Sequence, residues 1–140
     1  MMKESIFEKC LYQYIVERDG TEIDYKDWFN YMISMRQDID SHSKHNNMGY
    51  DFDTTPQRIL KKLGYSNSQV KTINKCVDNS FNIPSDLRTD NSILSEDKQW
   101  QQLMRVTSYP SITINNQTYG GDFDGHDISV ALCASFSERP

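Results

Sequence analysis

The sequence has no long apolar run, no basic stripe and no closely spaced pair of cysteines. A membrane-spanning helix needs about 20 consecutive, mostly apolar residues, and the opening stretch MMKESIFEKC lacks the apolar segment of a signal peptide. We therefore expect no direct membrane contact from this segment. The 15 Lys and Arg are scattered among 20 Asp and Glu, which gives a net charge of −5. This charge pattern predicts that nucleic acid is not a partner.

Cysteine is scarce, and Cys10, Cys76 and Cys133 lie far apart in the sequence. Neither a CxxC motif nor the spacing of a zinc site is present. Their odd number agrees with one bridge plus one thiol, or with a bridge to a cysteine outside this segment. A catalytic thiol usually lies at a helix N-terminus, where its pKa is lowered, whereas Cys10 and Cys133 fall in the middle of predicted helices. We predict structural cysteines and no catalytic residue.

Two short motifs resemble metal sites but lack essential ligands. His42 and His45 form an HxxH pattern in the polar segment 40–53, which reads as a loop and offers no third ligand nearby. The stretch DFDGHD at 122–127 resembles a calcium loop, yet Cys133 stands where such a loop ends in glutamate. A solvated loop and a helix cap at Asp124 explain the two motifs better, so we expect no metal and no cofactor.

Helical periodicity dominates the chain up to about residue 104. Thr55 is expected to cap one helix with Pro56 in its first turn, and Ser66 or Ser68 is expected to cap the next. The residues expected to face inward, helix by helix, are Ile6, Phe7, Cys10, Leu11, Tyr14 and Ile15; then Trp28, Phe29, Met32 and Ile33; then Ile59, Leu60 and Leu63; then Val70, Ile73 and Val77; then Ile93, Leu94, Trp100 and Met104.

β-strand signals appear only after the predicted helices. SITI and QTY flank Asn115 and Asn116, which favour the positive φ angles of a type I′ turn, so 111–120 is predicted to be a hairpin. Pro110 precedes its first strand. A last helix over about 124–137, with Ile128, Ala131, Leu132 and Phe136 inward, follows the hairpin. The length of 140 residues fits one domain over 1–140, with a helical part at about 4–104 and the hairpin and last helix at about 106–138.

Several motifs of the chain, in their order, resemble one protein family. The motifs are FEKCLYQYI, DYKDWFNYM, LGYSNSQVKTINKCVDNSF, DNSILSEDKQWQQL, YPSITINNQTYGG and SVALCASFSERP. Together they resemble the luminal region of plant-type vacuolar sorting receptors. The cysteines of that family between the Trp-containing helix and the Leu-Gly helix are absent, as MISMRQDIDSHSKHNN stands there instead.

This resemblance implies an α+β, mostly helical fold: the C-terminal part of a thioredoxin-like domain of the DsbA type, with a helical insertion and with Pro110 in the cis state beside the binding face. It implies that the segment before that proline, Thr107, Ser108, Tyr109 and Pro110, pairs with an extended partner peptide. It also implies a disulfide between Cys76 and Cys133. The sequon Asn116-Gln117-Thr118 predicts a glycan on Asn116 in a luminal protein.

The resulting hypothesis is a non-enzymatic binding or assembly module of a membrane glycoprotein, in the endomembrane lumen or at the cell surface. Its partner is expected to be a protein or peptide, which includes the missing remainder of its own protein. Two alternatives stay open. One is a thiol-disulfide oxidoreductase whose catalytic cysteines lie upstream of this chain, and the other is a structural accessory subunit of a large assembly.

Overall fold

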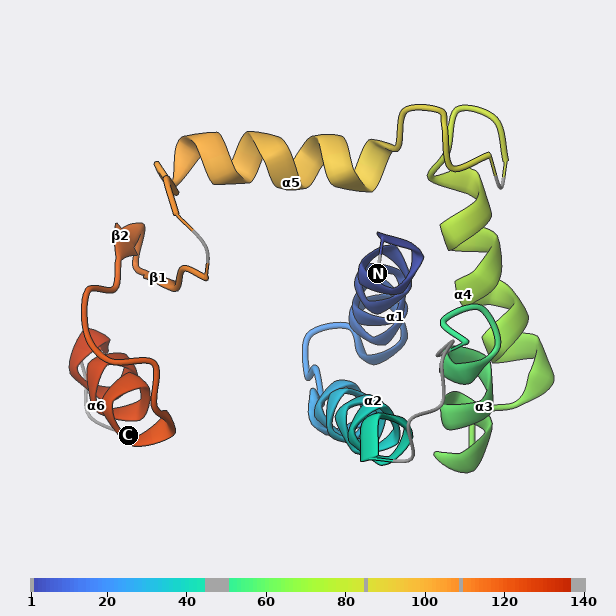
Figure 1. Cartoon of the computed structure of the whole chain (residues 1–140), viewed down its shortest axis with the longest axis horizontal. Helices are drawn as coiled ribbons and strands as arrows, with labels where there is room; N and C mark the ends of the chain where they lie inside the picture. Colours follow the sequence, from blue (N-terminus) through green and yellow to red (C-terminus); the bar gives the residue numbers. More distant parts are fainter. Residues whose placement is uncertain (1, 45–50, 85, 109, 137–140) are drawn as a thin grey trace. The chain divides into compact units, whose positions relative to one another are not determined.

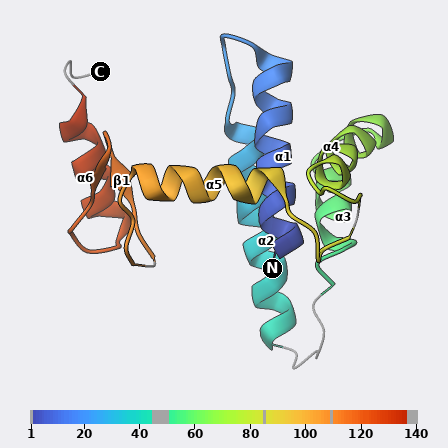
Figure 2. The ribbon, with the colours of Figure 1, turned by 90° about the horizontal axis from the view of Figure 1, so that it is seen from above.

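The computed structural model describes residues 2–44, 51–84, 86–108 and 110–136. Over these residues the chain is mostly helical, with one small sheet (Figures 1 and 2). None of the helices that the model describes is both long and apolar enough to cross a membrane. The elements are α1 (Met2–Asp19), α2 (Lys26–Lys44), α3 (Thr55–Lys62), α4 (Asn67–Asn79), α5 (Ser92–Leu103), β1 (Thr113–Ile114), β2 (Gln117–Thr118) and α6 (Gly125–Ser135).

The chain divides into two compact units, residues 1–94 and residues 95–140. In the first unit α1 packs against α2 and α4, and α3 also contacts α2 and α4, so the four helices surround one core. In the second unit β1 contacts β2 and α6. The grouping of both units in a single domain stays a prediction.

The core of the first unit is built around the apolar stripe of α1. Ile6, Leu11 and Ile15 are fully buried, as helical spacing predicted, and Cys10 is 1% exposed among them. Cys10 is joined to Cys76 of α4 by a disulfide. The bond ties α1 to α4 across 66 residues of sequence, so it restricts the unfolded chain strongly.

The buried face of α2 differs from the prediction. Phe29 and Ile33, expected inside, are 57% and 55% exposed, whereas Tyr31 and Met35 are buried. Helix α2 carries apolar residues on two neighbouring stripes, and only one can point at α1 and α3. The stripe of Tyr31 and Met35, flanked by the partly buried Trp28 and Met32, takes that place.

Local signals fix the turn between α3 and α4. Gly64, at φ +92°, ends α3, and the Tyr65 N–H donates to the Leu60 carbonyl at 3.0 Å, the long bond of a Schellman motif. Ser66 and Gln69 then form a capping box at the start of α4. The prediction of Ser66 as a cap is therefore confirmed.

The predicted cap of α3 is wrong by one residue. Thr54 holds the N-cap position, and Thr55 is buried in the first turn. Thr54 makes no capping bond with its own side chain. Instead Asp51 accepts hydrogen bonds from the Asp53 N–H at 2.9 Å and the Thr54 N–H at 3.1 Å. Asp51 therefore orders the turn that leads into α3, and it does not accept the amides of the first helical turn that an N-cap side chain would bind.

A polar network joins the end of α1, the start of α2 and the turn between α3 and α4. Arg18 of α1 forms an ion pair with Asp27 of α2 at 3.0 Å, and the Tyr65 hydroxyl donates to the same carboxylate at 3.1 Å. Burial, and then the charge of Asp27, raise the pKa of Tyr65 to about 12. The tyrosine therefore stays a neutral donor and holds the turn before α4 against the start of α2.

The segment between α4 and α5 is a closed loop over its described residues. Phe81 and Asn91 form an antiparallel bridge. The buried Asn91 donates to the Ser80 hydroxyl at 2.6 Å, and its side-chain oxygen accepts the Leu94 N–H at 3.1 Å. Asn91 therefore links the end of α4 to the start of α5, and Ile93 is buried in the first unit.

The second unit has no buried residue among those that the model describes. Arg105, two residues after the end of α5, has φ 54° in a position that usually holds glycine. The inward face predicted for the last helix is wrong in part, since Leu132 and Phe136 are 43% and 61% exposed. Ile128 and Ala131 are half-buried. The unit keeps its shape through local hydrogen bonds rather than a core.

The disulfide should dominate the stability of the first unit. A Cys10→Ala/Cys76→Ala variant is expected to lose about 2–5 kcal/mol of unfolding free energy, because a long loop is released in the unfolded state. Urea denaturation of the variant and the parent measures the loss. Cys133→Ser is the matched control and should leave the midpoint unchanged, since Cys133 is a free, exposed thiol. Equal destabilisation by both variants would contradict the assignment.

The pH dependence of the free energy of unfolding should depend in part on Glu8. Burial, and then the neighbouring Glu4, raise the pKa of the Glu8 carboxyl. Ionising the Glu8 carboxyl in the folded protein lowers the free energy of unfolding. This loss is absent below the pKa of the unfolded chain, about 4.3, and grows as pH rises through the folded pKa. Glu8→Gln should therefore be more stable than the parent at neutral pH, with a difference that vanishes in acid. Urea denaturation across pH measures the difference, and Glu17→Gln, at an exposed position of α1, is the matched control.

Candidate functional site

The hairpin forms where the sequence predicted it, although its strands are short. β1 and β2 are antiparallel, with Thr113 opposite Thr118 and Ile114 opposite Gln117. Asn115 and Asn116 have φ angles of 49° and 64°, as a type I′ turn requires. The Tyr119 N–H donates to the Ile112 carbonyl at 2.7 Å, which extends the pairing by one residue on each side.

This register decides which backbone groups face away from the hairpin. Pairs in an antiparallel ladder alternate between hydrogen-bonded and non-hydrogen-bonded. Ile112 and Tyr119 are a bonded pair, so Thr113 and Thr118 are a non-bonded one. The N–H and C=O of Thr113 therefore point to the outer edge of β1, and those of Thr118 to the outer edge of β2. In the sheet that the model describes, neither edge pairs with a further strand.

The segment predicted to bind a partner leads directly into β1. Thr107, Ser108 and Pro110 are exposed, and Tyr109 lies outside the described residues. The Ser111 hydroxyl donates to the Ser108 carbonyl across the proline. The described residues of this segment are not in a strand, and they precede β1 in the chain.

The predicted disulfide between Cys76 and Cys133 is corrected by the structure. Cys76 pairs with Cys10, and Cys133 is a free, exposed thiol on α6. The resemblance had favoured two cysteines of the C-terminal half, whereas the packing of α1 on α4 places Cys10 and Cys76 with their Cα atoms 5.8 Å apart. That distance lies within the range of a disulfide.

The two motifs that resemble metal sites have structural roles in the described residues. His42 belongs to α2 rather than to a loop, and its Nδ1 lies 2.9 Å from the Asp38 carbonyl oxygen. His45 lies outside the described residues. Asp124 caps α6 as predicted, accepting the His126 and Asp127 N–H groups at 2.8 and 3.0 Å. These bonds, that of Asp127 first, lower the pKa of Asp124.

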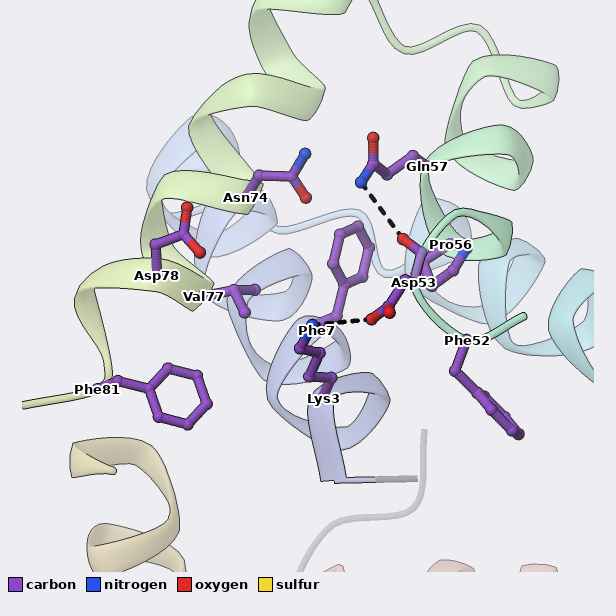
Figure 3. Close-up of a pocket in the computed structure, with 10 residues that line it drawn as sticks. All are labelled: Lys3, Phe7, Phe52, Asp53, Pro56, Gln57, Asn74, Val77, Asp78 and Phe81. Atoms are coloured by element: carbon purple, nitrogen blue, oxygen red, sulfur yellow. Dashed lines mark hydrogen bonds and ion pairs between the residues drawn. The ribbon is translucent and has the colours of Figure 1, made fainter. Parts of the chain in front are cut away.

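A pocket of about 380 Å³ lies in the first unit between α1, α3 and α4 (Figure 3). Its apolar wall includes Phe7, Pro56 and Phe81, which are all buried. Asn74 and Gln57 carry carboxamides that point toward one another from α4 and α3. The pocket thus combines an apolar wall with hydrogen-bonding groups at its opening.

The mouth of this pocket is held in place by the turn before α3. Asp51 accepts the Asp53 N–H, and Asp53 forms a 2.9 Å ion pair with Lys3 of α1. The Gln57 side chain donates to the Asp53 carbonyl at 3.4 Å. A hydrogen bond with the Thr54 hydroxyl, first among several, lowers the pKa of Asp51 and keeps this carboxylate ionised.

Sequence reasoning did not find the pocket. Lys3 with Phe7 and Asn74 with Asp78 each lie one helical turn apart, which places each pair on a shared face. That spacing was the available signal, but nothing in it indicated that the two faces meet. The turn at Phe52 and Asp53 lies in a segment predicted to be only a loop.

Comparison with known proteins identifies a family. Residues 1–133 match the family model described as the vacuolar sorting receptor thioredoxin-like domain. No curated protein and no solved structure matches the chain. The matched residues cover α1 to β2 and most of α6. The chain therefore belongs to the family of vacuolar sorting receptor thioredoxin-like domains.

Proposed function

We propose that the chain is a non-enzymatic binding or assembly module of a vacuolar-sorting-receptor-like membrane glycoprotein, which recognises protein cargo or a partner chain. The match of residues 1–133 to the receptor domain family is the observation that carries this proposal. The cysteines agree with it. Cys10 and Cys76 are joined, and the remaining Cys133 lies within α6 rather than at its N-terminus, where a redox thiol would be activated.

The proposed compartment is the endomembrane lumen or the cell surface. Disulfides form and persist in oxidising compartments, and Cys10–Cys76 links two core helices of the first unit. A sequon at an exposed turn fits the same environment.

The proposed binding element is the outer edge of β1 with the segment 107–110 before it. We propose a DsbA-type thioredoxin arrangement, in which the helical part at about 4–104 contains a helical insertion and a proline precedes this strand. An extended peptide added beside β1 would pair with the outward N–H and C=O of Thr113. Thr107, Ser108, Tyr109 and Pro110 would then flank the added strand.

Proline substitutions distinguish the two edges of the hairpin. Thr113→Pro removes the donor on the outer edge of β1 without removing a hydrogen bond of the β1 and β2 ladder. Thr118→Pro does the same on the outer edge of β2. If peptides add to β1, the first variant should lose about tenfold in affinity, the value of one lost hydrogen bond, and the second should bind normally.

The measurement is a titration of the isotope-labelled chain with pools of extended peptides, followed by amide NMR. The amides of Ser111 and Thr113 should shift in the parent. Because Thr113→Pro has no N–H at position 113, the variant is followed at Ser111, whose shift should disappear. Peptide binding that is equally weak in both proline variants, or that leaves these amides unmoved, would contradict strand addition at β1.

Asn116 is the proposed glycan site. It is exposed at the tip of the turn with φ 64°. Its neighbour Asn115 is engaged, since the Asn115 side chain donates to the Ser135 carbonyl at 3.0 Å. A glycan on Asn116 would extend from the tip of the turn and leave the outer edge of β1 open.

Secretion from a eukaryotic host tests the glycan. The parent chain should carry one endoglycosidase-sensitive glycan, and both Asn116→Gln and Thr118→Ala should lose it. Thr118→Ser is the matched control, since it keeps the sequon and should keep the glycan. A mass spectrum in which the secreted parent has an unmodified Asn116 would refute the assignment.

A further inference from the structure

The stretch from Thr54 to Val77, which forms α3, the turn after it and most of α4, contains no aspartate or glutamate. Its positive charges are those of Arg58, Lys61, Lys62, Lys71 and Lys75. Since the whole chain carries −5 and this stretch +5, the rest of the chain carries −10. The charges are spaced over two helices, so no run of basic residues marks them in the sequence. A basic region within an acidic chain can attract an anionic partner.

The four lysines of this stretch are exposed, and among the described residues none of them forms an ion pair. Arg58 differs, because it donates to both carboxylate oxygens of Asp38, at 2.9 and 2.8 Å. Lys3 and Arg36, which lie outside the stretch, also have acidic partners. The charges of the four lysines are therefore available to a ligand.

The lysines of α4 do not stabilise their own helix. Lys61 and Lys62 lie in the last turn of α3, where the helix dipole favours positive charge. Lys71 and Lys75 lie in the interior of α4 and are four residues apart, and like charges at that spacing destabilise a helix. A charge pair that costs stability at an exposed position favours a role in binding.

Lysines of both helices lie beside the line where α3 meets α4. Gln57 of α3 and Asn74 of α4 point toward one another (Figure 3). Lys61 follows Gln57 by four residues, and Lys71 precedes Asn74 by three. At these spacings each lysine shares a helix face with the neighbouring carboxamide. One ligand can therefore contact lysines of both helices.

A hollow on the exposed face of α3 gives a ligand room beside these charges. Its volume is about 540 Å³. The described residues that line it are Thr54, Gln57, Arg58, Lys61 and Lys62. Cations predominate in this lining and none of these residues is acidic, so the hollow suits a carboxylate.

A short acidic peptide fits this surface better than a long polyanion. Electrostatic interactions between exposed charges are screened beyond about 8 Å at physiological ionic strength. A short acidic segment can stay within that distance of the lysines. Nucleic acid or an anionic membrane extends further and meets the remainder of the chain, which carries −10 against the +5 of this stretch within the total of −5.

From these features we infer that the exposed face of α3 and the adjoining side of α4 bind an acidic segment of a protein partner, whose carboxylates pair with Lys61, Lys71 and Lys75. The inference rests on the proposed function, which supplies a protein or peptide partner. It adds a chemistry for that partner and a binding surface on the first unit, apart from the hairpin edge.

Fluorescence anisotropy of labelled peptides, titrated with the full chain, tests the inference. The probe is a Ser/Gly peptide with a short central run of glutamates, and its two matched peptides carry glutamine or lysine instead. The Glu peptide should bind about tenfold more tightly than the Gln peptide, and its binding should weaken as the salt concentration rises. Equal affinity for the three peptides would overturn the inference.

Variants of the chain locate the surface. Lys61→Gln/Lys71→Gln should weaken binding of the Glu peptide about fivefold, because two charge pairs are lost. Lys26→Gln/Lys98→Gln is the matched control, since it removes the same charge from exposed positions outside the stretch and should bind normally. Equal weakening by both double variants would show a response to net charge alone and overturn the site. Circular dichroism and the thermal midpoint establish that each variant is folded.

The hairpin variant separates this inference from the proposed function. Binding of the Glu peptide that is kept in Thr113→Pro and weakened in Lys61→Gln/Lys71→Gln supports the basic surface. If the Glu peptide does not bind while the peptide pools still shift the Ser111 amide, the inference fails and the proposed function stands. An absence of binding by every peptide, including the pools, counts against both.

Two further probes test the choice of a peptide as the ligand. These are vesicles that contain phosphatidylserine and a single-stranded oligonucleotide. Both should bind more weakly than the Glu peptide, because they also meet the acidic remainder of the chain. Tighter binding of either one, lost in Lys61→Gln/Lys71→Gln, would identify a membrane or nucleic-acid surface and overturn the peptide as its ligand.

Discussion

The disulfide between Cys10 and Cys76 is the constraint on which the first unit depends. It joins α1 to α4, two of the three helices that line the pocket. Phe7 lies about one helical turn before Cys10, and Val77 directly follows Cys76. Because the Cα atoms of the two cysteines are held 5.8 Å apart, the bond also limits how far the apolar walls can separate. The covalent link that stabilises the core thus also holds together two of the three helices that line the pocket.

Local chemistry was predictable from the sequence, and its predictions were confirmed at particular residues. Ser66 caps α4, Asp124 caps α6, and Asn115 with Asn116 form the turn, since each depends on neighbours within a few residues. Long-range choices were not predictable. The buried stripe of α2 and the partner of Cys76 depend on how helices pack, and α2 offered two apolar stripes of similar strength. The resemblance correctly gave the family, yet it assigned the wrong partner to Cys76.

The two candidate sites also differ in how far the sequence alone predicts them. The hairpin edge could be predicted because the proline, the turn and the strands follow one another in the chain. The pocket could not, because its walls come from three separated segments and consist of ordinary residue types. Only packing brings Lys3 within 2.9 Å of Asp53. No residue of the pocket is unusual alone, so its chemistry arises from the arrangement.

The hairpin and its proposed ligand are energetically linked. An isolated two-stranded hairpin is marginally stable in water, and residues 95–136, apart from 109, contain no buried side chain in the described structure. What holds β1 and β2 are the ladder, the Asn115 contact with Ser135 and the packing of α6 on β1. A third strand added beside β1 would satisfy Thr113 and order the hairpin in one step. Part of its binding energy is then spent on that order, so partner affinity and hairpin stability should rise and fall together.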